Sequence, residues 1–180
     1  MTLVFEPDAI LRTLVRHGVR FVVVGGLAGN IRGSADVTND LDICYARDEE
    51  NLKRLADSLR ELGAHLRVAP EPNADLPFQL DAATLKAGDT FTFATEHGDL
   101  DVLATPRGTE GFEDLDRSAT FVELSDGLSV RVASIDDLIR MKRAAGRTKD
   151  LLQLEHLAAL REEIDAFRAR GLDPQQGDPG

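Results

Sequence analysis

Two pairs of aspartates are the side chains of this sequence best suited to chemistry. Asp40 and Asp42 stand on either side of Leu41, and Asp99 and Asp101 stand on either side of Leu100. Residues two apart on a β-strand point to the same side, about 6.6 Å apart along it. If the two strands are neighbours, at a spacing of about 4.8 Å, three carboxylates surround one cation site. Carboxylate oxygens suit Mg²⁺ or Mn²⁺, so the pairs predict a metal site.

A glycine pair lies upstream of the first aspartates. Gly25 and Gly26 directly follow the apolar run Val22–Val24. Without side chains, glycines let the backbone come close to a phosphate, above all where a helix begins. Metal ligands next to a phosphate-binding turn indicate phosphoryl or nucleotidyl transfer.

The elements that must position these residues follow from hydrophobic periodicity and turn signals. Helical spacing predicts a helix from Pro7, stopped by Gly18, and a patterned helix that starts at Asp48 and stops at Gly63. Further helices are predicted at 25–33, 134–145 and 149–168. Strands are predicted at 19–24, 41–45 and 65–68, and as hairpins at 90–95 with 99–103 and 121–124 with 128–132. Interleaved strands and helices predict an α+β fold, in which a mixed sheet is flanked by helices and followed by C-terminal helices.

Length and composition bound the organisation of the chain. The 180 residues, 42% of them hydrophobic, are enough for one domain with a real core. We predict a core over 1–133, a helical segment packed on it over 134–170, and a disordered tail over 171–180. The stretch 70–77 holds three prolines and is predicted to be a loop.

Several classes of protein are disfavoured by the sequence. No apolar run approaches the roughly 18–20 residues of a transmembrane helix, and the N-terminus lacks the features of a secretory signal. The one cysteine, Cys44, fits a reducing compartment and excludes a cysteine-rich zinc site. The prediction is therefore a cytoplasmic protein without a membrane partner.

The charge is unevenly distributed. A net charge of −11 opposes binding of nucleic acid over a broad surface. A dense basic stretch nevertheless lies between Arg140 and Lys149. It is either a local site for a small polyanion or a solvated helix face.

Three motifs in order resemble the nucleotidyltransferase superfamily, which has the DNA polymerase β-like fold. They are 25–33 with 38–42, then 98–103, then 134–142 with 147–150. The spacing is similar to that of the minimal nucleotidyltransferases and of bacterial toxins of the AbiEii or MenT type. The resemblance implies metal-dependent transfer of a nucleoside monophosphate from an NTP, the co-substrate, with release of pyrophosphate.

The resemblance also assigns roles by position. Asp40 and Asp42 would be metal ligands, and Asp101 would be the third catalytic carboxylate, a ligand or a base for the acceptor hydroxyl. Asp101 is preferred to Asp99 because the family's acid stands three residues after the glycine, here Gly98. The residues that would bind the nucleotide are Gly25, Gly26, Arg32, Thr38, Lys142, Lys149 and Asp150.

The chain departs from the family pattern at two places. Much of the superfamily has Gly-Ser where this chain has Gly25-Gly26, so a hydroxyl contact to a phosphate is lost, and Arg32 is the candidate for a compensating donor. After Asp150, the segment 151–153 lacks the acid common in relatives.

The resemblance favours an RNA acceptor, the 3′ end of tRNA, and a toxin with a cognate antitoxin protein. Because the chain is acidic, a protein or a small molecule such as an antibiotic stays open as the acceptor. A non-catalytic binding module or antitoxin with the same fold is the alternative from another class, and a domain with chance aspartates is a third. Retention of all three acids favours an enzyme.

Overall fold

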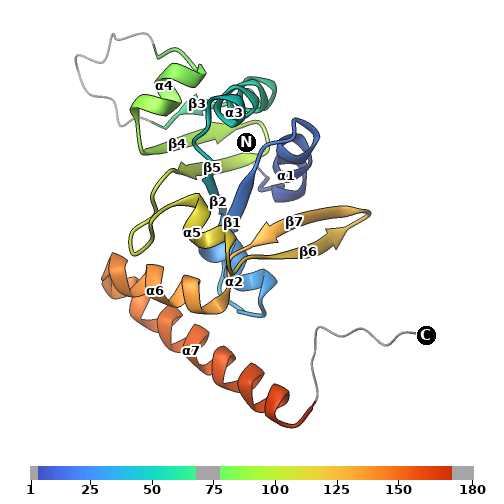
Figure 1. The fold of residues 1–180 in the computed structure, drawn as a ribbon, viewed down its shortest axis with the longest axis vertical. Helices are drawn as coiled ribbons and strands as arrows, with labels where there is room; N and C mark the ends of the chain where they lie inside the picture. Colours follow the sequence, from blue (N-terminus) through green and yellow to red (C-terminus); the bar gives the residue numbers. More distant parts are fainter. Residues whose placement is uncertain (1–3, 68–77, 172–180) are drawn as a thin grey trace.

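Seven strands form one mixed sheet through the middle of the molecule (Figure 1). The structure, a computed structural model, describes residues 4–67 and 78–171. The strands are β1 (Phe21–Val24), β2 (Asp40–Tyr45), β3 (His65–Leu66), β4 (Thr90–Thr95), β5 (Gly98–Leu103), β6 (Thr120–Ser125) and β7 (Leu128–Val132). The helices are α1 (Pro7–Arg16), α2 (Gly25–Ile31), α3 (Glu49–Glu61), α4 (Ala82–Ala87), α5 (Phe112–Asp116), α6 (Ile135–Ala145) and α7 (Thr148–Ala169).

The order of the strands places the two aspartate-bearing strands side by side. Across the sheet the order is β3-β4-β5-β2-β1-β7-β6. β2 pairs with β5 and β1 with β7 in parallel, and the other pairs are antiparallel. All four residues of β1 are buried, as expected of a β-branched strand in the interior of a sheet.

Capping residues fix where helices α3, α4 and α6 begin, and at α4 the cap is Asp81. Asp48 accepts a hydrogen bond from the backbone N–H of Asn51 at the start of α3, and Ser134 does the same for Asp137 at the start of α6. Gly146, with φ +61°, ends α6 in the left-handed conformation, and α7 then packs beside α6. In Figure 1 the two helices lie together at one end of the sheet, and α7 extends away from it.

The predicted fold class is confirmed, with differences in detail. β1 begins at Phe21 and not at Val19, and β3 has only two residues. The short helices α4 and α5 were not predicted, because five or six residues give too little periodicity to recognise. The predicted loop at 70–77 and all but the first residue of the predicted tail lie outside the described residues. The division into a core and a helical segment stays a prediction.

Candidate active site

The parallel pairing of β2 with β5 brings the aspartate pairs together. Asp40 lies opposite Asp99 and Asp42 opposite Asp101. Residues that are paired across strands project from the same face of a sheet. The four carboxylates therefore form a block of two by two on one face, which we call the acidic block.

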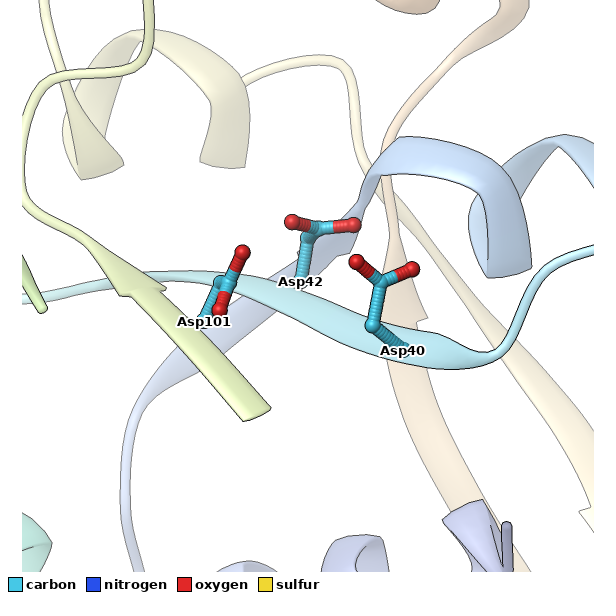
Figure 2. A group of neighbouring side chains, drawn as sticks. All are labelled: Asp40, Asp42 and Asp101. Carbon is cyan, nitrogen blue, oxygen red and sulfur yellow. The ribbon is translucent and has the colours of Figure 1, made fainter. Parts of the chain in front are cut away.

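Three members of the acidic block converge. Asp40, Asp42 and Asp101 each offer one carboxylate oxygen, and these oxygens lie within 4.8 Å of one another. Figure 2 shows the three side chains on the same side of the sheet, two from β2 and one from β5. Within residues 4–67 and 78–171 this is the one group of His, Cys, Asp and Glu side chains arranged to hold a metal ion.

The glycine pair makes room for the cluster. Gly25 has φ +68°, and a Cβ atom there would lie 2.2 Å from Asp42 Oδ2. A Cβ atom on Gly26 would lie 2.9 Å from Thr38 Oγ1. Thr38 Oγ1 in turn donates to the backbone oxygen and to Oδ1 of Asp40, both at 3.1 Å. The backbone thus approaches the carboxylates so closely that no side chain fits.

The cluster carries more negative charge than its surroundings neutralise. Burial, followed by the charges of Asp40 and Asp101, raises the pKa of Asp42 to about 7, against the opposing charges of Lys142 and Arg147. Burial also raises the pKa of Asp101, although the charge of Arg67 opposes that effect and the charges of Asp40 and Asp99 add to it. Carboxylates this close repel one another unless a cation lies among them, so the donor set fits a bound divalent metal.

An arginine that the sequence analysis did not single out contacts the acidic block. Arg67, directly after β3, donates from Nη1 to Asp99 Oδ2 at 2.6 Å and from Nη2 to Asp101 Oδ1 at 3.0 Å. The sequence offered no signal for this contact, because it depends on the order of β3, β4 and β5 in the sheet.

The predicted phosphate-binding lysine lies at the junction of α6 and α7. Lys142 Nζ donates to Asp150 Oδ1 at 3.0 Å and to Gln153 Oε1 at 2.6 Å, and Arg147 Nε donates to Asp150 Oδ2 at 3.0 Å. Asp150 thus orients Lys142. Gln153 supplies a neutral acceptor to the same ammonium group.

The other two predicted cationic residues differ from Lys142. Arg32 is half-buried and donates to the backbone oxygens of Val132 and Ala133 and to Thr120 Oγ1, which ties α2 to the β6–β7 side of the sheet. Lys149 is exposed at the start of α7.

The remaining polar candidates belong to local contacts. His17, His97 and His156 each contact one carboxylate, of Glu61, Glu6 and Asp36 respectively. Cys44 is buried, and burial raises the pKa of its thiol to about 12. A thiol with so high a pKa is a core residue and not a nucleophile.

Comparison with known proteins identifies the fold. No protein-family model and no curated protein matches the sequence. A similar solved structure is the lincosamide antibiotic adenylyltransferase LnuA with lincomycin bound, at 15% identity, 88% coverage of this chain, 99% coverage of LnuA and a TM-score of 0.58. Another is the antibiotic-resistance factor ANT(2'')-Ia, at 18% identity, 91% and 90% coverage and a TM-score of 0.52. The chain has a nucleotidyltransferase fold. The AbiEii or MenT branch that the sequence favoured stays a prediction.

Proposed function

We propose that this protein is a divalent-metal-dependent nucleotidyltransferase that moves a nucleoside monophosphate from an NTP to an acceptor hydroxyl. The observation that carries the proposal is the convergence of Asp40, Asp42 and Asp101 within 4.8 Å. The nucleotidyltransferase fold supports it, because the cluster lies on adjacent parallel strands of that fold.

The proposed metal ligands are these three carboxylates. Burial and, after it, the charges of Asp40 and Asp101 raise the pKa of Asp42, and a bound cation would offset both effects. A bound Mg²⁺ or Mn²⁺ would lower the pKa of a coordinated hydroxyl and neutralise charge on the phosphates. Thr38 donates a hydrogen bond to the Asp40 carboxylate, and Gly25 and Gly26 leave space in which phosphates approach the backbone.

The protein's own groups then account for the transfer. The acceptor oxygen attacks the α-phosphorus of the NTP, the bond from that phosphorus to the β-phosphate oxygen breaks, and pyrophosphate leaves with the bonding electrons. Asp101 accepts the proton of the acceptor hydroxyl. Lys142, oriented by Asp150 and Gln153, neutralises the triphosphate, and Lys149 adds charge from the start of α7. Arg32 has no part in this scheme, since its guanidinium is bound to the backbone of Val132 and Ala133.

For the acceptor we propose the hydroxyl of a small molecule, in preference to RNA. Of the basic stretch, Arg140 is paired with Asp114 and Asp137, and Lys142 and Arg147 are paired with Asp150. Ion pairs within the described residues thus leave only Arg143 and Lys149 of the stretch unpaired. Because Lys142, although paired, is assigned to the triphosphate of the NTP, the stretch offers few cations to an RNA acceptor. With a net charge of −11 on the chain, RNA would be repelled over most of the surface.

An active enzyme is favoured over a non-catalytic binding module or antitoxin. A site that had lost its function would have no need to keep oxygens of three mutually repelling carboxylates within 4.8 Å of one another. The toxin hypothesis, with tRNA as acceptor and a cognate antitoxin, is tested by the same assay, which includes tRNA among the acceptors.

The test is transfer of label from each of the four NTPs in the presence of Mg²⁺. The acceptors are a panel of aminoglycoside and lincosamide antibiotics, total tRNA, and the protein itself. Asp42→Asn should lose at least about 10²-fold in rate, because it removes a proposed ligand. The matched control is Asp57→Asn, whose carboxylate lies on α3 and is 60% exposed, and it should retain full activity.

Each result has a distinct meaning. Label on an antibiotic supports the proposal in full, whereas label on tRNA supports the toxin hypothesis and overturns the small-molecule acceptor. Transfer that survives Asp42→Asn, or that needs no divalent metal, overturns the proposed mechanism. Absence of both NTP binding and transfer favours the non-catalytic module.

A further inference from the structure

Arg67 stands in a row of residues that crosses four neighbouring strands. Its backbone N–H donates to the oxygen of Thr92 on β4 at 2.9 Å, which continues the β3–β4 ladder by one residue. Thr92 lies opposite Asp101 on β5, and Asp101 lies opposite Asp42 on β2. Residues paired in this way share a face, so Arg67 projects over β4 toward the acidic block.

The guanidinium of Arg67 binds the two β5 members of the acidic block at once. It contacts Asp99 Oδ2 and Asp101 Oδ1 at 2.6 and 3.0 Å. A guanidinium keeps its charge and presents a planar set of donors, which suits it to bridge two carboxylates. Asp101 is therefore shared between Arg67 and the cluster of three carboxylates, whereas Asp99 belongs to Arg67 alone.

We infer that Arg67 is the resident counter-cation of the acidic block: it stabilises the metal-free protein and competes electrostatically with a divalent ion for Asp101. This inference rests on the proposed function, since it assumes that the cluster binds a metal. Asp99, which does not belong to the cluster, gains a role as the second anchor of the guanidinium. Arg67 is thus a positioning residue for Asp101.

The size of the effect follows from charge and distance. Arg67 Nη2 lies 3.0 Å from an oxygen of Asp101, and the ligand oxygens lie within 4.8 Å of one another. Even at the dielectric constant of water, a unit charge about 6 Å from a divalent ion changes binding of that ion roughly tenfold, so tenfold is a lower bound for a partly buried site. Removal of Arg67 should accordingly tighten metal binding, whereas a lost ligand would weaken it.

The experiment is a Mn²⁺ titration of nucleotide-free protein, followed by electron paramagnetic resonance, together with thermal unfolding. Arg67→Gln should bind Mn²⁺ roughly tenfold more tightly than the wild type. Its metal-free Tm should fall, and saturating Mn²⁺ should raise its Tm by more than it raises that of the wild type. Arg60→Gln, an exposed arginine paired with Asp57 on α3, is the matched control and should behave as the wild type.

The charge-conserving variant distinguishes charge from structure. Arg67→Lys should keep the Mn²⁺ dissociation constant within about threefold of the wild type, because an ammonium group still supplies the charge. If Arg67→Gln does not fold without metal, refolding that depends on Mn²⁺ supports the inference. If Arg67→Gln does not fold even with Mn²⁺, a Mn²⁺ dissociation constant of Arg67→Lys tenfold smaller than that of the wild type overturns the inference.

Failure of the inference and failure of the proposed function give different results. Equal or weaker Mn²⁺ binding by Arg67→Gln, with nucleotidyl transfer intact in the wild type, overturns the inference alone. Tighter binding by Arg67→Gln, with no transfer to any acceptor, leaves the inference standing and overturns the proposed function.

Discussion

Two aspartates of this protein have opposite electrostatic surroundings. Asp42 lies among other carboxylates, and burial followed by their charges raises its pKa to about 7. The side chain of Asp150 is 4% exposed, and burial alone would raise its pKa. Hydrogen bonds and charges from Lys142 and Arg147 outweigh that effect, so the pKa of Asp150 is lowered instead.

The charge of Asp150 is neutralised within the fold, whereas the charge of Asp42 is not. At the α6–α7 junction the fold supplies two cations to one carboxylate, which is how a buried charge is made tolerable. In the acidic block one arginine, Arg67, forms ion pairs, and within the described residues Asp40 and Asp42 have none. Charge that the protein does not neutralise itself is typical of a binding site.

The pH dependence of stability is the sharpest test of this contrast. The folded-state pKa of Asp42 is raised from 3.8 to about 7, so between these values the folded protein binds the proton more tightly than the unfolded chain does. The free energy of unfolding of metal-free protein should therefore fall as the pH rises from about 4 to about 7, by at most about 4 kcal/mol from this group.

Urea unfolding in EDTA at pH 5 and pH 8 measures this effect. Asp42→Asn should remove most of the loss at pH 8, and Mg²⁺ should reduce it in the wild type. Asp57→Asn should leave the loss unchanged. A wild type equally stable at both pH values in EDTA would show that the acidic block is already neutralised.

Replacing Asp150 should destabilise the fold, whereas replacing Asp42 should stabilise the metal-free protein at pH 8. Asp150→Ala would leave Lys142 and Arg147 without their shared carboxylate, at a cost of about 3 kcal/mol in the free energy of unfolding. Asp165→Ala, on the same helix but 59% exposed, should cost less than about 0.5 kcal/mol. Similar losses for the two variants would mean that Asp150 is no more structural than a surface residue.

The close approach of Gly25 to Asp42 is tested by adding one methyl group. Gly25→Ala places a Cβ atom 2.2 Å from Asp42 Oδ2 in a residue with φ +68° and should cost about 2–3 kcal/mol as well as displace the carboxylate. Gly127→Ala is the matched control, because Gly127 has φ +75° and nothing within 4 Å of the added atom. It should lose only about 1 kcal/mol, from backbone strain alone.

Weaker Mn²⁺ binding by Gly25→Ala than by Gly127→Ala would show that the glycine serves the cluster. Equal losses of stability and equal Mn²⁺ affinities in the two variants would contradict this role.

Local patterns in the sequence predicted all the strands and every helix except α4 and α5, because each of these elements is encoded over neighbouring residues. The hairpin of β4 and β5 followed from two alternating runs around Glu96–Gly98, and the start of α6 from Ser134. The parallel pairing of β2 with β5 joins strands far apart in the chain, so local patterns could not predict it. The prediction of a metal site had to assume this pairing.

What the sequence did not predict depends on three-dimensional neighbours. Arg67 reaches Asp101 only because β3 and β5 flank β4. The contact between Lys142 and Gln153 similarly depends on the turn at Gly146, which folds α7 back beside α6. The predicted assignment of phosphate contacts to Arg32 rested on its distance along α2, whereas its partners Val132 and Ala133, at the end of β7, are remote in sequence.

The smallest expected effect concerns the two basic residues at the α6–α7 junction that the protein leaves unpaired within the described residues. Arg143 and Lys149 are exposed, so replacing both with Gln should change the free energy of unfolding by less than about 0.5 kcal/mol. For a small-molecule acceptor, the salt dependence of acceptor binding should stay the same. For RNA, each lost phosphate contact should instead reduce the magnitude of the negative slope of log K against log salt by about one. A shallower salt dependence with tRNA in the double variant would therefore mean that RNA binds at this junction. The α6–α7 junction would then be a binding site as well, and its contrast with the acidic block would no longer hold.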